Sequence, residues 1–241
     1  LANVTTLWWL GYKIIYGANS VIESVKDGTD KQSDYIKGEN YFLRAICHLH
    51  LVTMYAKPYT SGRSNPGNVL RNSTDNSKTE RATVGEVYDQ IVADLKEAIR
   101  LMGNGGTRRG NAGYASKAAA QGLLSRVYLY MEENQKVIDL VNEMLDGADP
   151  STKLEPSATF PKYFANALTS KETLCAVADT DLETRGQASI GSMYLNDGTG
   201  WGETYSSDPL NNLYERYPND LRYSYVVPVY KTNATNYMIT F

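Results

Sequence analysis

Apolar residues recur at helical spacing through residues 1–146, and this periodicity constrains the fold more than any other feature of the sequence. The clearest stretch starts at Thr83-Val84-Gly85-Glu86, which has the S/T-x-x-E form of a capping box. Apolar residues then follow three or four positions apart as far as Met102, and Gly103 interrupts them. The pattern therefore predicts a helix over residues 84–102.

The same periodicity predicts four further helices in this part of the chain. Asp27-Gly28 ends the first of them, Pro58 stops the second, and Ser116 can cap the third. Residues 58–82 are rich in Ser, Asn, Gly and Thr and show little periodicity, so we expect a long loop there. The expected helices cover residues 7–25, 42–56, 116–130 and 134–145.

Small residues lie on the apolar stripes of several of these helices. Small side chains let two helix axes approach to the short end of the usual range of about 8–10 Å. Long helices in sequence-adjacent pairs, with small residues at the crossings, predict a mainly α fold of stacked helical hairpins, similar to tetratricopeptide arrays. The small residues concerned are Gly11, Ala18, Ala45, Ala118, Ala119 and Gly122.

Residues 147–241 have a different character. They contain Trp201 and nine of the 19 tyrosines, and residues 186–209 are rich in Gly, Ser, Asp and Thr. Glu172 to Val177 is predicted to form a short strand, and residues 210–217 a short helix. We expect this part to consist of loops and short strands that pack on the helical part, residues 1–146, within the same domain.

Composition excludes several classes of protein. The net charge of −3 gives no general attraction to nucleic acid. Two cysteines, Cys47 and Cys175, rule out a disulfide-dense scaffold and a Cys-rich zinc site. The chain starts on Leu1 and ends on an apolar segment, so we interpret it as part of a longer protein.

Catalytic and cofactor-binding patterns are not found in the sequence. The only two histidines, His48 and His50, lie about 200° apart on a helix, so they cannot share a metal. We expect one to be packed and the other exposed. The glycine-rich run 103–110 fits neither a dinucleotide-binding nor a phosphate-binding loop. The pattern therefore favours a binding or scaffold protein without catalytic residues, cofactor or metal.

Five segments, in this order, resemble the SusD/RagB family of Bacteroidetes outer-membrane nutrient-binding lipoproteins. The second segment contains GENYFLRA at residues 38–45, which is similar to the family's G-E-A-x-F-L-R-A helix, with Asn40 in place of Ala. The third follows the family's pattern R-x-S/T-V-x-E-V-Y-x-x-I-x-x-D-L-x-x-A. The segments are Trp8 to Ile22, Gly38 to Pro58, Arg81 to Ala98, Ser116 to Tyr130, and Glu172 to Val177.

This resemblance implies a tetratricopeptide-like helical array on which loops and short strands form a glycan-binding face. It implies a non-catalytic protein that is held on the cell surface, at the outer membrane, by a lipid anchor outside this chain. It further implies that the protein passes captured oligosaccharides to a TonB-dependent transporter. The chain would then cover roughly the N-terminal half of a family member.

The motif residues also have a structural interpretation. Arg44 lies among apolar neighbours on a helix with small residues, and we expect its guanidinium to tie loops or helix ends together. Arg126 has the same kind of sequence context. We expect Trp8, Trp9 and Asn19 to belong to the helical frame.

The candidate ligand residues come from chemistry, because no ligand-contact motif carries over from the family. Pyranose rings have apolar faces that stack on aromatic side chains, and hydroxyl groups that need polar partners. The segment 193–205 offers this mixture on a glycine-rich stretch, and the loop containing Tyr59 is a further candidate. The residues we predict to bind glycan are Trp201, Tyr194, Tyr205, Asn196 and Asp197.

Two other functions stay open at this point. The paired helices also suit a helical-repeat scaffold for protein–protein interaction, which would present a concave groove. A helical-toroid glycoside hydrolase would need two carboxylates facing each other across a cleft.

Overall fold

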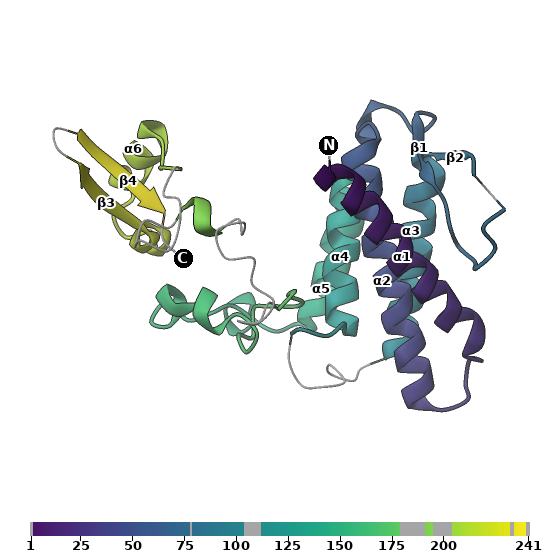
Figure 1. The fold of residues 1–241 in the computed structure, drawn as a ribbon. Helices are drawn as coiled ribbons and strands as arrows, with labels where there is room; N and C mark the ends of the chain where they lie inside the picture. Colours follow the sequence, from purple (N-terminus) through teal and green to yellow (C-terminus); the bar gives the residue numbers. More distant parts are fainter. Residues whose placement is uncertain are drawn as a thin grey trace. The chain divides into compact units, whose positions relative to one another are not determined.

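The computed structural model describes residues 2–77, 79–103, 112–178, 191–194, 204–231 and 234–239. The chain divides into two compact units, Leu1–Pro150 and Ser151–Phe241 (Figure 1). We refer to them as unit 1 and unit 2. That residues 147–241 pack on the helical part as one domain stays a prediction.

Unit 1 is an array of five helices, which confirms the predicted mainly α fold. Each helix packs on the next one along the chain, and Figure 1 shows the helices side by side. The core lies mainly between the second, third and fourth helices and includes Phe42, Leu49, Ile91, Leu95 and Val127. The helices are α1 (Ala2–Ser24), α2 (Lys31–Tyr55), α3 (Val84–Met102), α4 (Lys117–Tyr130) and α5 (Asn134–Leu145).

The predicted helix caps are present. Thr83 and Glu86 form a full capping box at α3, since each side chain bonds the other residue's backbone N–H. The Ser116 side chain accepts a hydrogen bond from the N–H of Ala119 at the start of α4. Asp30 caps α2 in the same way. These side chains satisfy N–H groups that a helix leaves unpaired in its first turn.

Small residues do lie where helices approach closely. A Cβ added to Gly11 on α1 would lie 3.3 Å from a methyl group of Leu51 on α2. A Cβ added to Gly38 on α2 would lie 2.8 Å from Cγ of Met102 on α3. The first three helices therefore pack closely because the sequence supplies glycine at these contacts.

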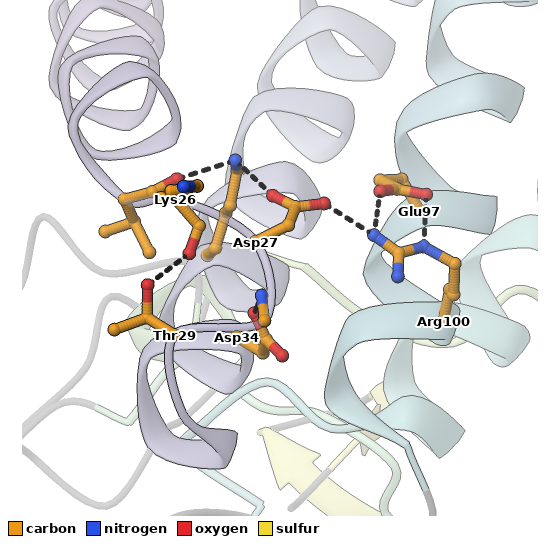
Figure 2. A network of polar contacts seen from close by, with 9 residues as sticks. Lys26, Asp27, Thr29, Asp34, Glu97 and Arg100 are labelled. Carbon is orange, nitrogen blue, oxygen red and sulfur yellow. Dashed lines mark hydrogen bonds and ion pairs between the residues drawn. The ribbon is translucent and has the colours of Figure 1, made fainter.

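A polar network ties the α1–α2 turn to α3, as Figure 2 shows. The Asp27 carboxylate accepts hydrogen bonds from Nζ of Lys37, at 2.5 Å, and from Arg100, at 2.8 Å. Arg100 also pairs with Glu97 on α3. The turn therefore contacts both neighbouring helices through one carboxylate.

The predicted loop 58–82 contains structure that the sequence analysis missed. It includes the 3-10 turn η1 (Tyr59–Ser61), and strand β1 (Pro66–Val69) pairs antiparallel with β2 (Arg81–Thr83). These strands are too short for an alternating pattern to show in the sequence. Arg81 Nε donates to the carbonyl of Gly67 at 2.5 Å and helps to hold the pair.

Unit 2 contains short elements, as predicted, but their positions differ from the prediction. The expected helix at 210–217 is α6 (Asp208–Arg216), whereas the strand predicted at 172–177 is wrong. Those residues form turns and irregular backbone, because no strand in the described part of the chain pairs with them. The hairpin of β3 (Val226–Lys231) and β4 (Ala234–Ile239) was not predicted, nor was the 3-10 turn η7 (Leu221–Tyr225).

A cluster of rings holds part of unit 2 together. Tyr225 packs against Phe160 and Phe164 with ring centroids 6.0 and 5.3 Å apart. Its hydroxyl donates to the carbonyl of Phe160 at 2.6 Å.

In the described part of the chain, no helix has the length and apolar character that crossing a membrane requires.

Candidate functional site

A buried ion pair lies at the centre of unit 1. Arg44 on α2 donates two hydrogen bonds to the Asp94 carboxylate on α3, from Nε at 2.8 Å and from Nη2 at 2.6 Å. Its Nη1 donates to Oδ1 of Asn19 on α1 at 2.8 Å and to the carbonyl of Asn72 at 3.0 Å. The guanidinium therefore joins three helices to the connection between β1 and β2, which confirms the role expected for Arg44.

Asn19 and His48 also hold the connection between β1 and β2 in place. The Asn19 amide donates to the carbonyls of Ser73, at 2.7 Å, and of Arg71, at 3.3 Å. The His48 ring lies between the Arg71 carbonyl, 3.2 Å from Nε2, and the amide of Asn68, 3.1 Å from Nδ1. A carbonyl can only accept, so Nε2 carries the proton and Nδ1 accepts from Asn68.

Burial lowers the pKa of His48 to about 4, so the ring is neutral near pH 7. His48 is fully buried and His50 is exposed, as predicted. Arg126, by contrast, is exposed on α4 and does not repeat the buried setting of Arg44. The expectation from the sequence context of Arg126 is wrong, because this side chain lies on the outer face of α4.

A groove of about 300 Å³ lies between α1 and the connection from β1 to β2, residues 70–80. We call it the α1 groove. The helix contributes mainly aromatic side chains, and the connection contributes mainly polar ones. The lining residues are Trp8, Trp9, Tyr12, Tyr16 and Asn19 on α1, Val69 at the end of β1, and Arg71, Ser73, Asn76 and Thr79 on the connection.

Two of the four aromatic residues are held in place by other side chains. The Trp8 ring contacts the rings of Tyr12 and Tyr55, each with centroids 4.9 Å apart. The Tyr12 hydroxyl donates to the carbonyl of Val69 at 2.7 Å, and burial raises its pKa above the ordinary value. Trp8 is therefore part of the helical frame, as predicted.

The other two aromatic residues of the groove face solvent. Trp9 is 59% exposed and Tyr16 is 49% exposed, so the expectation that Trp9 belongs to the frame is wrong. The Lys13 ammonium lies 5.0 Å from the centroid of the Trp9 ring. Exposed rings beside amide, guanidinium and hydroxyl groups suit a ligand that has apolar ring faces and hydroxyls.

A second, more polar groove of about 830 Å³ lies on the other side of the same connection, against α3. Arg81, Glu86, Asp89 and Gln90 contribute to its lining, and Thr79 lines both grooves. None of its described lining residues is aromatic. This groove offers hydrogen-bonding groups but no surface for ring stacking.

The structure describes two of the five predicted ligand residues. Tyr194 and Tyr205 are both half-buried, and the N–H of Thr204 donates to the carbonyl of Met193 at 3.1 Å. The segments that carry the two tyrosines are therefore neighbours. Trp201, Asn196 and Asp197 lie outside the described residues.

Tyr59, the further candidate in the loop, has structural contacts. Its ring packs on that of Tyr88 with centroids 4.9 Å apart, and its hydroxyl accepts from Arg63 at 2.8 Å.

In unit 2 another groove, of about 580 Å³, lies beside α6 and includes Tyr214, Tyr217 and Arg222. Within the described ranges, no three His, Cys, Asp or Glu residues group as metal ligands would.

The sequence analysis named Trp8, Trp9 and Asn19 but did not predict the α1 groove. Trp9 and Tyr16 are seven positions apart, so they lie on one face of α1, and that spacing is visible in the sequence. The polar side of the groove comes from residues more than fifty positions later. No local pattern shows that the two segments meet.

Comparison with known proteins gives the family. Residues 2–129 match the SusD-like family model that is described as starch-binding and associating with the outer membrane. No curated protein is similar enough in sequence to count as a match.

Solved structures share the fold. A SusD superfamily protein from Bacteroides vulgatus ATCC 8482 matches with a TM-score of 0.83 and 25% identity, over 97% of this chain and 54% of that chain. One from Bacteroides thetaiotaomicron VPI-5482 matches with a TM-score of 0.78 and 26% identity, over 94% and 51%. A laminarin-binding SusD-like protein has a TM-score of 0.71 at 20% identity, over 97% and 57%. The chain spans about half the length of these proteins.

Proposed function

This chain belongs to the SusD-like family of starch-binding, outer-membrane-associated proteins, and we propose that it captures oligosaccharides at the cell surface for nutrient uptake. The observation that carries the proposal is the family match over residues 2–129. The Arg44–Asp94 pair and the helical array that it joins lie within this range. The laminarin-binding protein of the same fold supports a glycan as the ligand.

In this proposal the protein binds its glycan without acting on it as an enzyme. It delivers its glycan to a TonB-dependent transporter in the outer membrane. A lipid anchor outside this chain holds it on the cell surface. These three statements rest on the family, whose members associate with the outer membrane.

We assign the glycan contacts to the residues predicted from the sequence. Trp201 would supply a stacking surface, with Tyr194 and Tyr205 beside it and Asn196 and Asp197 as hydrogen-bonding partners. The hydrogen bond between Thr204 and Met193 supports the proposal, because it joins the two tyrosine-bearing segments.

The test is a binding panel with the full-length protein. Isothermal titration calorimetry would use laminarin, maltooligosaccharides, xylan, mannan and pectin fragments, with the wild type and Trp201→Ala. Tyr130→Ala is the matched control, because Tyr130 is an exposed aromatic residue on α4 that lines none of the three grooves described above. Binding of one glycan class, weakened by Trp201→Ala and not by the control, is the expected result.

Other outcomes would contradict parts of the proposal. Binding that Trp201→Ala leaves unchanged would remove the assigned contacts and keep the function. A complete failure of the wild type to bind any glycan would contradict the function and favour a protein-interaction scaffold.

A further inference from the structure

We infer that the α1 groove is a second glycan-binding surface, in which Trp9 and Tyr16 stack on sugar rings and the connection beside them binds the hydroxyls. The inference rests on the proposed function. It adds a site in unit 1, whereas the contacts assigned above lie in residues 193–205 of unit 2.

The spacing of the two exposed rings indicates the size of the ligand. Trp9 and Tyr16 lie seven residues apart on α1, which is close to two helical turns and about 10 Å along the axis. Both residues line the same groove. That separation is longer than one pyranose ring, so a ligand must have at least two sugar rings to contact both side chains.

The connection supplies hydrogen-bonding groups along the same groove. Arg71, Ser73, Asn76 and Thr79 line it, which gives a guanidinium, an amide and two hydroxyls. The Arg71 guanidinium has one long contact, from Nη1 to the carbonyl of Asp75 at 3.4 Å. This distance exceeds the usual range of about 2.7–3.2 Å, so the contact is weak and a sugar hydroxyl can replace it.

Hydrogen bonds within the protein hold the connection in place beside the groove. The backbone of the connection is fixed by Asn19 at Arg71 and Ser73 and by Arg44 at Asn72. The Glu23 carboxylate on α1 accepts two more hydrogen bonds from Thr74, one from the Thr74 N–H at 2.7 Å and one from the Thr74 hydroxyl at 2.6 Å. Binding therefore does not need to order this segment, which removes an entropic cost.

The same arrangement makes the site testable without unfolding the protein. Asn19 and His48 contact the carbonyl of Arg71 and not its side chain, so the Arg71→Ala variant keeps both of these hydrogen bonds. Trp9 and Tyr16 are exposed, so their truncation leaves no cavity in the core.

The experiment measures the Kd of the full-length protein for the same glycan panel. The groove variants are Trp9→Ala, Tyr16→Ala and Arg71→Ala. Leu10→Ala on α1 and Tyr130→Ala on α4 are matched controls, because both residues are exposed and neither lines the groove. Thermal unfolding of every variant checks that folding is unchanged.

We expect Trp9→Ala and Tyr16→Ala each to raise the Kd about three- to tenfold, as the loss of one aromatic contact predicts. The controls should stay within a factor of about two of the wild type. A monosaccharide of the glycan that binds should not be weakened by both Trp9→Ala and Tyr16→Ala, since one sugar ring is too short to contact both side chains.

Three results overturn the inference and can be told apart. Wild-type binding that all three groove variants leave unchanged rejects the α1 groove and keeps the proposed function. No binding by the wild type contradicts the proposed function itself. Equal weakening by Leu10→Ala and Trp9→Ala would show that the loss does not come from the groove, and it also rejects the inference.

Discussion

The buried pair of Arg44 and Asp94 allows a sharp prediction about stability. The side chains of these residues are 5% and 2% exposed, and the guanidinium donates two hydrogen bonds to the carboxylate. Asp94→Leu removes the carboxylate and leaves a buried cation without its counter-charge. Breaking a buried pair in this way costs about 3–5 kcal/mol. Since domains are stable by about 5–15 kcal/mol, the free energy of unfolding should fall by a large fraction.

Urea unfolding of the protein, followed by far-UV circular dichroism, measures this loss. With an m-value of about 2 kcal/mol/M, the urea midpoint should fall by about 1.5–2.5 M. Arg44→Met should cost a similar amount, because Gln90, at 2.7 Å, is then the one side chain among the described residues that still donates to Asp94. The double variant removes both charges, so its loss should be well below the sum of the single losses.

An exposed ion pair in the same unit provides the control. Arg63 and Asp89 lie 2.7 Å apart with side chains 55% and 56% exposed, so Asp89→Leu should cost about 0–1 kcal/mol. If Asp94→Leu costs no more than this control, the Arg44–Asp94 pair is not desolvated and the reasoning fails. Additive losses in the double variant would also refute it.

Two further predictions concern stability. Because burial lowers the pKa of His48 to about 4, the unfolded state binds a proton between about pH 6.5 and pH 4 that the folded state does not, and stability should fall as the pH falls through this window. The free energy of unfolding, measured by urea unfolding at pH 7 and at pH 4, should fall by about 3 kcal/mol between the two. If the His48→Gln variant shows the same pH dependence as the wild type, the prediction is wrong. Gly38→Ala should destabilise by about 1–3 kcal/mol, since the new Cβ would lie 2.8 Å from Met102. A Cβ added to Gly17 on α1 would meet no described atom within 4 Å apart from its chain neighbours and the backbone of its own helix, so Gly17→Ala should instead stabilise by about 0.5–1 kcal/mol in the same assay. Equal effects of the two variants would refute the packing argument.

Local sequence patterns predicted the five helices of unit 1 and the caps at Thr83 and Ser116, although α1 and α2 begin before the predicted residues 7 and 42, at Ala2 and Lys31. The capping box at Thr83 and the cap at Ser116 depend on residues three positions apart, and the helical stripes on residues three and four apart. The strand predicted at residues 172–177 failed, because a strand needs a partner that its own sequence does not specify. The β1–β2 and β3–β4 pairs were missed for the same reason.

The residues around Arg44 show both sides of this limit. The sequence indicated that a guanidinium among apolar neighbours must be paired, because a buried charge without a partner is too costly. It did not identify Asp94, which lies fifty residues later, or the carbonyl of Asn72. The same limit applied to Trp9, because the periodicity of its helix did not show that its ring would be exposed.

The sequence alone determined the helical class, the caps, the opposite settings of His48 and His50, and the family resemblance, since each depends on neighbouring residues or on ordered motifs. Only the tertiary structure decided that Trp9 and Tyr16 meet Arg71 and Asn76 in one groove. The physical reason is that hydrogen bonds from Asn19 and Arg44 position a segment with no periodicity of its own, and these bonds form only once three helices have packed.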